Sequence, residues 1–196
     1  LVVSLAAALE GSSTIAVGNV IGSNIANVGL VLGLSSLVFP LTMKFSQVKF
    51  DLGIYMIVCL LFTYFCMDGQ IIRMEGLILF ACIIAYTWFS ITYPAKNKNP
   101  EIGQINTNIA LSKSLLLIIL GILLLSFGAS IFITGAIDIA RYFGISEIVI
   151  GMTIVALGTS LPELATSVIA AFRKESAISI GNIIGSNLFN LLSVIG

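Results

Sequence analysis

The sequence predicts an all-α, polytopic membrane protein with inverted-topology repeats. Three observations lead there: the composition, the spacing of apolar stretches, and a polar motif that occurs twice. Of the 196 residues, 58% are hydrophobic, 9% are charged and none is histidine. This balance is typical of a chain whose surroundings are the lipid bilayer. The net charge of zero gives no indication of a nucleic-acid partner.

Uncharged stretches are near or above the roughly 20 helical residues that cross a hydrocarbon core. We expect five spanning helices from these stretches, at residues 11–43, 52–67, 76–93, 114–137 and 176–196. A sixth runs from about 148 to 172, and it alone among the apolar segments has an acid, Glu163, in its middle.

Catalytic chemistry lacks its usual parts in this sequence. There is no histidine, and the three cysteines fall inside apolar spans without paired spacing. We therefore expect neither an enzyme nor a resident cofactor. Because Leu1 opens the chain in the midst of an apolar stretch without methionine or a basic segment, we expect it to be a fragment.

The sequence repeats itself after 163 positions. Residues 1–33 align with 164–196 with 15 identities in 33. The densest part is Gly-Asn-x-Ile-Gly-Ser-Asn-x-x-Asn, at 18–27 and again at 181–190. Because polar residues recur here within apolar segments, the pattern indicates a duplication of the kind that builds secondary transporters.

The two copies are predicted to face opposite sides of the membrane. Seven of the nine basic residues fall in connections on one side, which the positive-inside rule makes cytoplasmic. The turn at 10–13 is then external and its counterpart at 173–176 internal. We predict a first inverted repeat at 1–93, truncated at its N-terminus (helices two to five), a cytoplasmic linker at 94–112, and a second repeat at 113–196, truncated at its C-terminus (helices six to eight).

The sixth span is predicted to break between Gly158 and Pro162. Proline cannot donate to the carbonyl of Gly158, and its ring crowds that turn. Carbonyls freed there would lie beside the hydroxyls of Thr159 and Ser160 and the carboxylate of Glu163, which are hard oxygen donors of the kind Na⁺ and Ca²⁺ prefer. A carboxylate in hydrocarbon needs a cation, a proton or a partner. The alternative is a protonated Glu163 that only bonds a neighbouring helix.

The repeated motif places polar side chains along one face of each helix. Asn19, Ser23 and Asn27 are spaced i, i+4, i+8, as are Asn182, Ser186 and Asn190. We expect Ser23, Asn27, Ser186 and Asn190 to face the ion. Asn24 and Asn187 point off that face, and bonding between helices accounts for them at least as well as the ion does. The glycines are expected to provide close-packing surfaces, at Gly18, Gly22, Gly29, Gly33, Gly181 and Gly185.

The segment GTSLPEL at 158–164 and the two repeated motifs resemble the α-repeats of the sodium/calcium exchanger family, in the cation/Ca²⁺ antiporter superfamily. The resemblance covers the chain as the second half of helix two to helix eight of a ten-helix fold. It implies metal ligands from both repeats: Ala156, Thr159, Ser160, Glu163, Ser186, Asn190, Ser23 and Asn27. Two departures are the first-repeat counterpart of Glu163, which would precede Leu1, and Asn190, where well-known archaeal and animal exchangers carry Asp.

These patterns predict a secondary active antiporter that exchanges Na⁺ for Ca²⁺ by alternating access at a midplane site, in a prokaryotic plasma membrane. Two alternatives use the same site: a cation/H⁺ antiporter and a K⁺-dependent Na⁺/Ca²⁺ exchanger. A channel is disfavoured because it would need a continuous polar stripe along several helices. An intramembrane hydrolase is disfavoured because Ser160 has no base.

Overall fold

The structure is a computed structural model that describes residues 13–92, 111–145 and 147–196. Within these residues every regular element is a helix. The first span is formed by α2 (Ser13–Ala26), the π-helix η1 (Asn27–Val31) and α3 (Leu32–Val38). The next three spans are α4 (Phe45–Phe65), α5 (Arg73–Thr92) and α6 (Leu111–Tyr142). The first twelve residues and nearly all of the predicted linker lie outside the described residues.

The second half of the described chain contains the broken span. It begins with α7 (Glu147–Ile150) and the π-helix η2 (Gly151–Val155), and continues as α8 (Ala156–Thr159) and α9 (Leu161–Phe172). The last span is α10 (Ser176–Phe189) with the π-helix η3 (Asn190–Val194). In the described residues, five helices are long and apolar enough to cross a membrane, and a bent pair makes a sixth span. The six predicted spans are confirmed.

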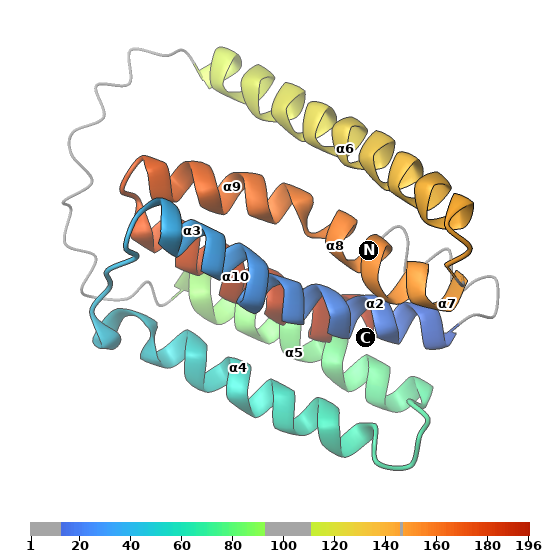
Figure 1. Cartoon of the computed structure of the whole chain (residues 1–196). Coiled ribbons are helices and arrows are strands. Elements are labelled where there is room, and N and C mark those ends of the chain that lie inside the picture. Colours follow the sequence, from blue (N-terminus) through green and yellow to red (C-terminus); the bar gives the residue numbers. More distant parts are fainter. Residues whose placement is uncertain (1–12, 93–110, 146) are drawn as a thin grey trace.

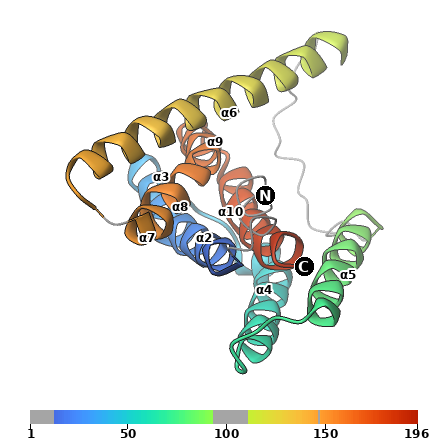
Figure 2. The same ribbon diagram turned by 90° about the vertical axis from the view of Figure 1, so that its right-hand side faces the viewer.

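Two spans cross at the middle of the bundle. Figures 1 and 2 show α2–η1–α3 lying against α10–η3, with α8 and α9 on one side and α4 and α5 on the other. The long helix α6 is outermost and packs against α8 and α9. Apolar side chains of α2, α4, α5, α10 and η3 form the main core, with Val20, Phe62, Leu79 and Leu188 at its centre. Burial of these side chains stabilises the crossing.

The sixth span bends at Ser160. The axes of the two halves, Thr153–Thr159 and Leu161–Phe172, differ by 47°. Ser160 leaves helical geometry with φ −91° and ψ 0°, and Pro162 follows in the first turn of α9, where proline costs no backbone hydrogen bond. The predicted break between Gly158 and Pro162 is confirmed.

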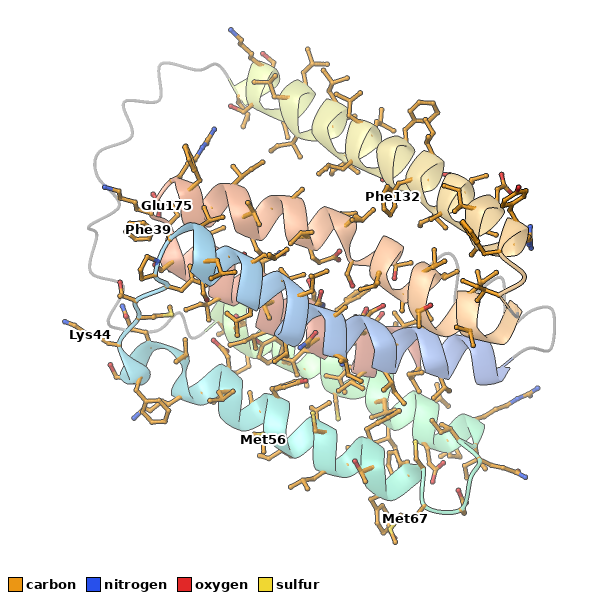
Figure 3. All side chains as sticks on the ribbon, in the orientation of Figure 1. Phe39, Lys44, Met56, Met67, Phe132 and Glu175 are labelled. Carbon is orange, nitrogen blue, oxygen red and sulfur yellow. The ribbon has the colours of Figure 1, made fainter. Side chains whose placement is uncertain are left out.

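The inverted sense of the repeats is visible where the end of the first span meets the start of α10. The backbone N–H of Thr42, just after α3, donates to Ser176 Oγ at 3.2 Å, and the Lys174 ammonium lies 5.7 Å from the centre of the Phe39 ring. The first span therefore ends where α10 begins, so the two run antiparallel. Figure 3 shows Lys44 and Glu175 at this end and Met67 at the other.

The π-helices mark the repeat in three dimensions. Shifted by 163 positions, η1 (Asn27–Val31) coincides with η3 (Asn190–Val194) residue for residue. Each begins at the last asparagine of the repeated motif. A π turn is rare and frequently occurs at functional sites, so its presence at the same position in both copies indicates this crossing as a candidate functional site.

Within the described residues, four of the predicted glycines make no close contact. A Cβ placed on Gly29, Gly33, Gly181 or Gly185 would meet no atom of the described chain within 4 Å. The reason is that no described helix packs on those faces. Close approach occurs instead at Gly158, where a Cβ would overlap the side chain of Ile133 on α6.

Candidate cation site

A small cavity lies where the two repeats cross at the bend. Its volume is about 110 Å³, and α2, η1, the bend and the α10–η3 junction all contribute to its wall. The lining residues are Asn19, Val20, Ser23, Asn27, Thr159, Ser160, Glu163, Phe189, Asn190 and Val194. Seven of these ten side chains are polar, and Glu163 is the one among the ten that carries an ionisable group.

Four oxygens on one side of the cavity share hydroxyl protons. Thr159 Oγ1 lies 3.0 Å from the Ala156 carbonyl oxygen, 3.0 Å from Ser23 Oγ and 3.3 Å from Asn19 Oδ1. Ser23 Oγ also lies 3.4 Å from the Ala156 carbonyl oxygen. The two hydroxyls supply one proton each, so lone pairs outnumber donors within this cluster. Such an arrangement favours a cation and also ties α8 to α2.

Three further oxygens are buried without a hydrogen-bond partner in the described chain. They are Asn27 Oδ1, Ser160 Oγ and Glu163 Oε2. All three residues line the cavity, and Asn27 and Ser160 are only 1% and 2% exposed. A buried polar atom without a partner costs free energy, more so for a charged group. A cation in the cavity would give these oxygens the partner that the described residues do not.

The asparagines beside the cavity bond across the repeats. Asn27 Nδ2 donates to Asn187 Oδ1 at 2.9 Å, and Asn190 Nδ2 donates to Asn24 Oδ1 at 3.0 Å. Asn24 and Asn187 therefore bond between helices, which confirms that prediction. On the second repeat, Asn182 Nδ2 donates to Ser167 Oγ at 2.9 Å and to the Glu163 carbonyl at 3.2 Å, which joins α9 to α10.

The structure brings together most of the predicted ligands. The cavity is lined by Ser23, Asn27, Thr159, Ser160, Glu163 and Asn190. Ser186 instead lines an adjoining hollow of about 370 Å³, which shares Glu163, Phe189 and Asn190 with the cavity. Ala156 does not line the cavity, and its carbonyl accepts from the hydroxyl cluster.

Two residues with a place in this arrangement were not predicted as ligands. Asn19 lines the cavity, and its signal was present in the i, i+4, i+8 spacing with Ser23 and Asn27. The Tyr55 hydroxyl of α4 lies 3.4 Å from Asn187 Nδ2. Its signal was weaker, because a tyrosine in an apolar span is usually read as packing.

The fold and the cavity together define a class of protein. Antiparallel repeats that cross at an oxygen-lined cavity beside a broken helix are the architecture of secondary transporters. Residues 1–92 and 113–196 match the family model described as sodium/calcium exchanger protein. The chain belongs to the sodium/calcium exchanger family and is an integral, multi-pass membrane protein. The resemblance found in the sequence is confirmed.

Individual relatives agree with this assignment. The inner membrane protein YrbG of Escherichia coli is 32% identical over all of this chain and 62% of its own length. The sodium/calcium exchanger MaX1 of Methanosarcina acetivorans is 31% identical, over 98% of this chain and 66% of its own length. A structure of the sodium-calcium exchanger NCX_Mj, soaked with zero Na⁺ and Ca²⁺, is similar with a TM-score of 0.81. That match has 34% identity over 99% of this chain and 62% of the other.

The chain thus spans less than two thirds of the length of these relatives. Its fold is the exchanger fold over the part that it covers, which confirms the predicted fold class.

Proposed function

We propose that the chain belongs to a secondary active antiporter that exchanges Na⁺ for Ca²⁺. The observation that carries the proposal is a group of three buried oxygens around one cavity that have no hydrogen-bond partner among the described residues: Asn27 Oδ1, Ser160 Oγ and Glu163 Oε2. Both repeats contribute to this group. Membership of the exchanger family supports the same function.

The chemistry of the lining suits these two ions. Ca²⁺ binds six to eight oxygens from carboxylates, amides, carbonyls and water, and Na⁺ accepts the same hard ligands. The cavity supplies one carboxylate from Glu163, amides from Asn19, Asn27 and Asn190, and hydroxyls from Ser23, Thr159 and Ser160. No lysine or arginine is among the described residues that line it. A bound metal cation would offset the charge of an ionised Glu163.

Exchange follows from the cost of an empty site. An ionised Glu163 without a counter-ion is unfavourable in a low-dielectric surrounding, so the empty, charged site is disfavoured during the transition between the two sides. Ca²⁺ therefore leaves the site when Na⁺ takes its place, and Na⁺ leaves when Ca²⁺ takes its place. Movement of one helix bundle against the other would open the cavity first to one side and then to the other.

We further propose that the protein lies in a prokaryotic plasma membrane with the end that carries Lys44 and Lys174 in the cytoplasm. The positive-inside rule supports this orientation. The similarity to an inner membrane protein of Escherichia coli supports the location.

Flux measurements on the intact protein test the proposed exchange. Proteoliposomes loaded with Na⁺ are diluted into Na⁺-free medium that contains radiolabelled Ca²⁺. We expect Ca²⁺ uptake that requires the outward Na⁺ gradient and stops when a sodium ionophore dissipates it. Uptake that is indifferent to Na⁺ would remove Na⁺/Ca²⁺ exchange from consideration.

A second candidate is cation/H⁺ antiport, and one observation favours it. Asn190 stands in the cavity as a neutral amide, so Glu163 is the one carboxylate among the lining residues. Protonation of a single carboxylate would discharge the site without Na⁺. Ca²⁺ uptake by the same vesicles under an imposed pH gradient, without Na⁺, would identify cation/H⁺ antiport. Na⁺-driven uptake that requires added K⁺ would identify K⁺-dependent exchange.

A further inference from the structure

We propose that Asn24 and Asn187 are positioning residues for the cation site. Each belongs to one repeat and turns the cavity-lining asparagine of the other repeat so that its amide oxygen, rather than its nitrogen, faces the ion. Asn24 acts on Asn190, and Asn187 acts on Asn27. The proposal rests on the proposed function only in that the cavity binds a cation.

The orientation of Asn24 is fixed by a group that cannot donate. Asn24 Nδ2 donates to the backbone carbonyl of Asn187 at 3.3 Å. A carbonyl only accepts, so the amide nitrogen of Asn24 must point to it, and Oδ1 must point the other way. Because Oδ1 also only accepts, Asn190 can meet it at 3.0 Å only through Nδ2. The oxygen of Asn190 is therefore the atom left to serve the cavity.

The other repeat has a different anchor, a tyrosine hydroxyl, which can donate as well as accept and so fixes the amide less strictly than a carbonyl does. Asn187 Nδ2 lies 3.4 Å from the Tyr55 hydroxyl, which leaves Asn187 Oδ1 to accept from Asn27 Nδ2 at 2.9 Å. Asn27 lines the cavity, and with its amide nitrogen bound to Asn187 its Oδ1 is left buried and without a partner in the described chain. Both positioning asparagines are themselves buried, Asn187 at 1% and Asn24 at 8% exposure.

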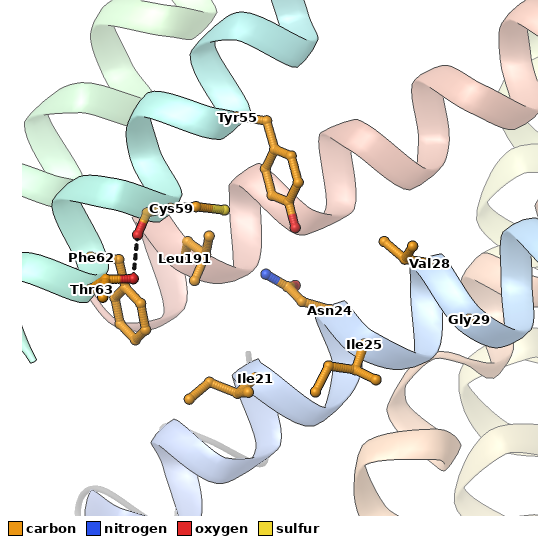
Figure 4. A pocket seen from close by; sticks show the side chains of 10 residues that line it. All are labelled: Ile21, Asn24, Ile25, Val28, Gly29, Tyr55, Cys59, Phe62, Thr63 and Leu191. Atoms are coloured by element: carbon orange, nitrogen blue, oxygen red, sulfur yellow. Dashed lines mark hydrogen bonds between the residues drawn. The ribbon is translucent and has the colours of Figure 1, made fainter.

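The positioning residues lie outside the cavity. Neither Asn24 nor Asn187 lines it. Asn24 lines a separate groove of about 560 Å³ between α2 and α4. Figure 4 shows Asn24 and Tyr55 pointing toward one another across this groove. Their effect on the ion is therefore indirect, through the amides that they hold.

The amide is the one ligand type for which such positioning matters. Turning an amide by half a rotation exchanges an oxygen, which binds a cation, for an NH₂ group, which repels it. A carboxylate has an oxygen on either side, so the same rotation changes nothing. Asn24 should therefore matter when residue 190 is asparagine and not when it is aspartate.

A double-mutant cycle tests this dependence. In the intact protein, Asn24→Leu keeps the size of the side chain but removes both hydrogen bonds. We expect the half-saturating Ca²⁺ concentration to rise about threefold to tenfold, the equivalent of one lost polar contact. In the Asn190→Asp background we expect Asn24→Leu to cause no loss. In that background Asn24→Leu also relieves a repulsion, because Asn24 Oδ1 and the carboxylate at residue 190 are both acceptors and would face one another.

A milder substitution tests the other half of the network. Tyr55→Phe removes only the hydroxyl that anchors Asn187, and we expect it to weaken Ca²⁺ binding without altering the yield of folded protein. Tyr86→Phe is the matched control, because the Tyr86 hydroxyl donates to Asp51 at 3.0 Å between α4 and α5, away from the cavity. It should leave the Ca²⁺ affinity unchanged.

Binding is read out separately from transport, as protection of the purified protein against thermal aggregation by Na⁺, K⁺ or Ca²⁺ chloride. If a cation protects the wild type and Asn24→Leu lowers the affinity only with asparagine at 190, the proposal stands, whether or not Na⁺-driven Ca²⁺ flux is found. Equal losses in both backgrounds would show a merely structural role and overturn it. Wild-type affinity in Asn24→Leu, or no protection of the wild type by any of the cations, would overturn it too.

Discussion

The hydroxyl oxygens of Ser23 and Thr159 lie 3.0 Å apart and join the first repeat to the broken helix of the second. Ser23 is 5% exposed and belongs to α2, whereas Thr159 is the last residue of α8, directly before the bend. Both line the cavity. Through this contact, oxygens from both repeats lie together in the wall of one cavity.

Removal of the Ser23 hydroxyl should weaken cation binding. Ser23→Ala deletes an oxygen of the cavity wall and the partner of Thr159, and we expect the half-saturating Ca²⁺ concentration to rise about threefold to tenfold. The measurement is Na⁺-driven Ca²⁺ uptake as a function of external Ca²⁺. Ser36→Ala is the control, since the exposed Ser36 hydroxyl donates to the Leu32 carbonyl of its own helix. Equal affinities in the two variants would contradict the assignment.

Glu163→Gln should abolish exchange and leave insertion and folding nearly unchanged. Glutamine keeps the shape and one oxygen but removes the charge that a divalent ion needs to offset its lost hydration. Insertion should not suffer, because a neutral amide costs less in hydrocarbon than a carboxylate. Flux is measured in proteoliposomes with the reconstituted protein quantified separately, and Glu175→Gln, just before α10, is the control. Wild-type flux from Glu163→Gln would return this residue to the alternative of a protonated packing residue.

Asn190→Asp should tighten Ca²⁺ binding or change the number of Na⁺ ions exchanged. The substitution adds a second carboxylate to a cavity that has one among its lining residues. Extra ligand charge raises the affinity of oxygen sites for Ca²⁺. The affinity is measured by thermal protection, and the ion ratio by the membrane potential at which net flux reverses. Weaker Ca²⁺ binding with an unchanged ion ratio would place residue 190 outside the coordination shell.

Gly158→Ala should destabilise the protein through its contact with α6. A methyl group there would overlap the Ile133 side chain, and forcing an extra methyl into a packed site costs about 1–3 kcal/mol. Thermal unfolding in detergent should show a lower midpoint, which Ile133→Ala in the same molecule should restore in part. Gly121→Ala, on a face of α6 where no described atom is within 4 Å, should have little effect. A destabilisation that Ile133→Ala does not relieve would mean that glycine is needed at 158 for the backbone alone.

The sequence was sufficient for features that depend on local rules. Pro162 removes a donor and crowds one turn, so the position of the bend could be predicted to within a residue or two. The six spans depend on the length of apolar runs, which charged residues bound. The helix α6 extends beyond its predicted range because Lys113, Asp138 and Arg141 lie near its ends, where charged side chains can reach the interface.

The composition of the site was harder to predict, because it depends on how helices cross. The i, i+4, i+8 rule put Asn19, Ser23 and Asn27 on one face, but only the crossing shows that the whole trio meets the bend. The same rule put Ser186 beside Asn190, yet α10 turns Ser186 to the neighbouring hollow. The π turns at η1 and η3 also escaped prediction, since hydrophobic periodicity assumes α-helical spacing throughout.

The two π turns also bear on the history of the chain. Each is a helix widened by one residue, and the widening falls at the same place in the two copies. We infer that a single insertion, made in an ancestral half before it was copied, accounts for both. The opposite senses of the two copies are what such a half would give if it entered the membrane in either orientation and assembled with its own inverted twin. On this view the polar crossing began as a contact between two identical polypeptides. Expression of one half alone, followed by a test for dual orientation and dimerisation, would examine that origin directly.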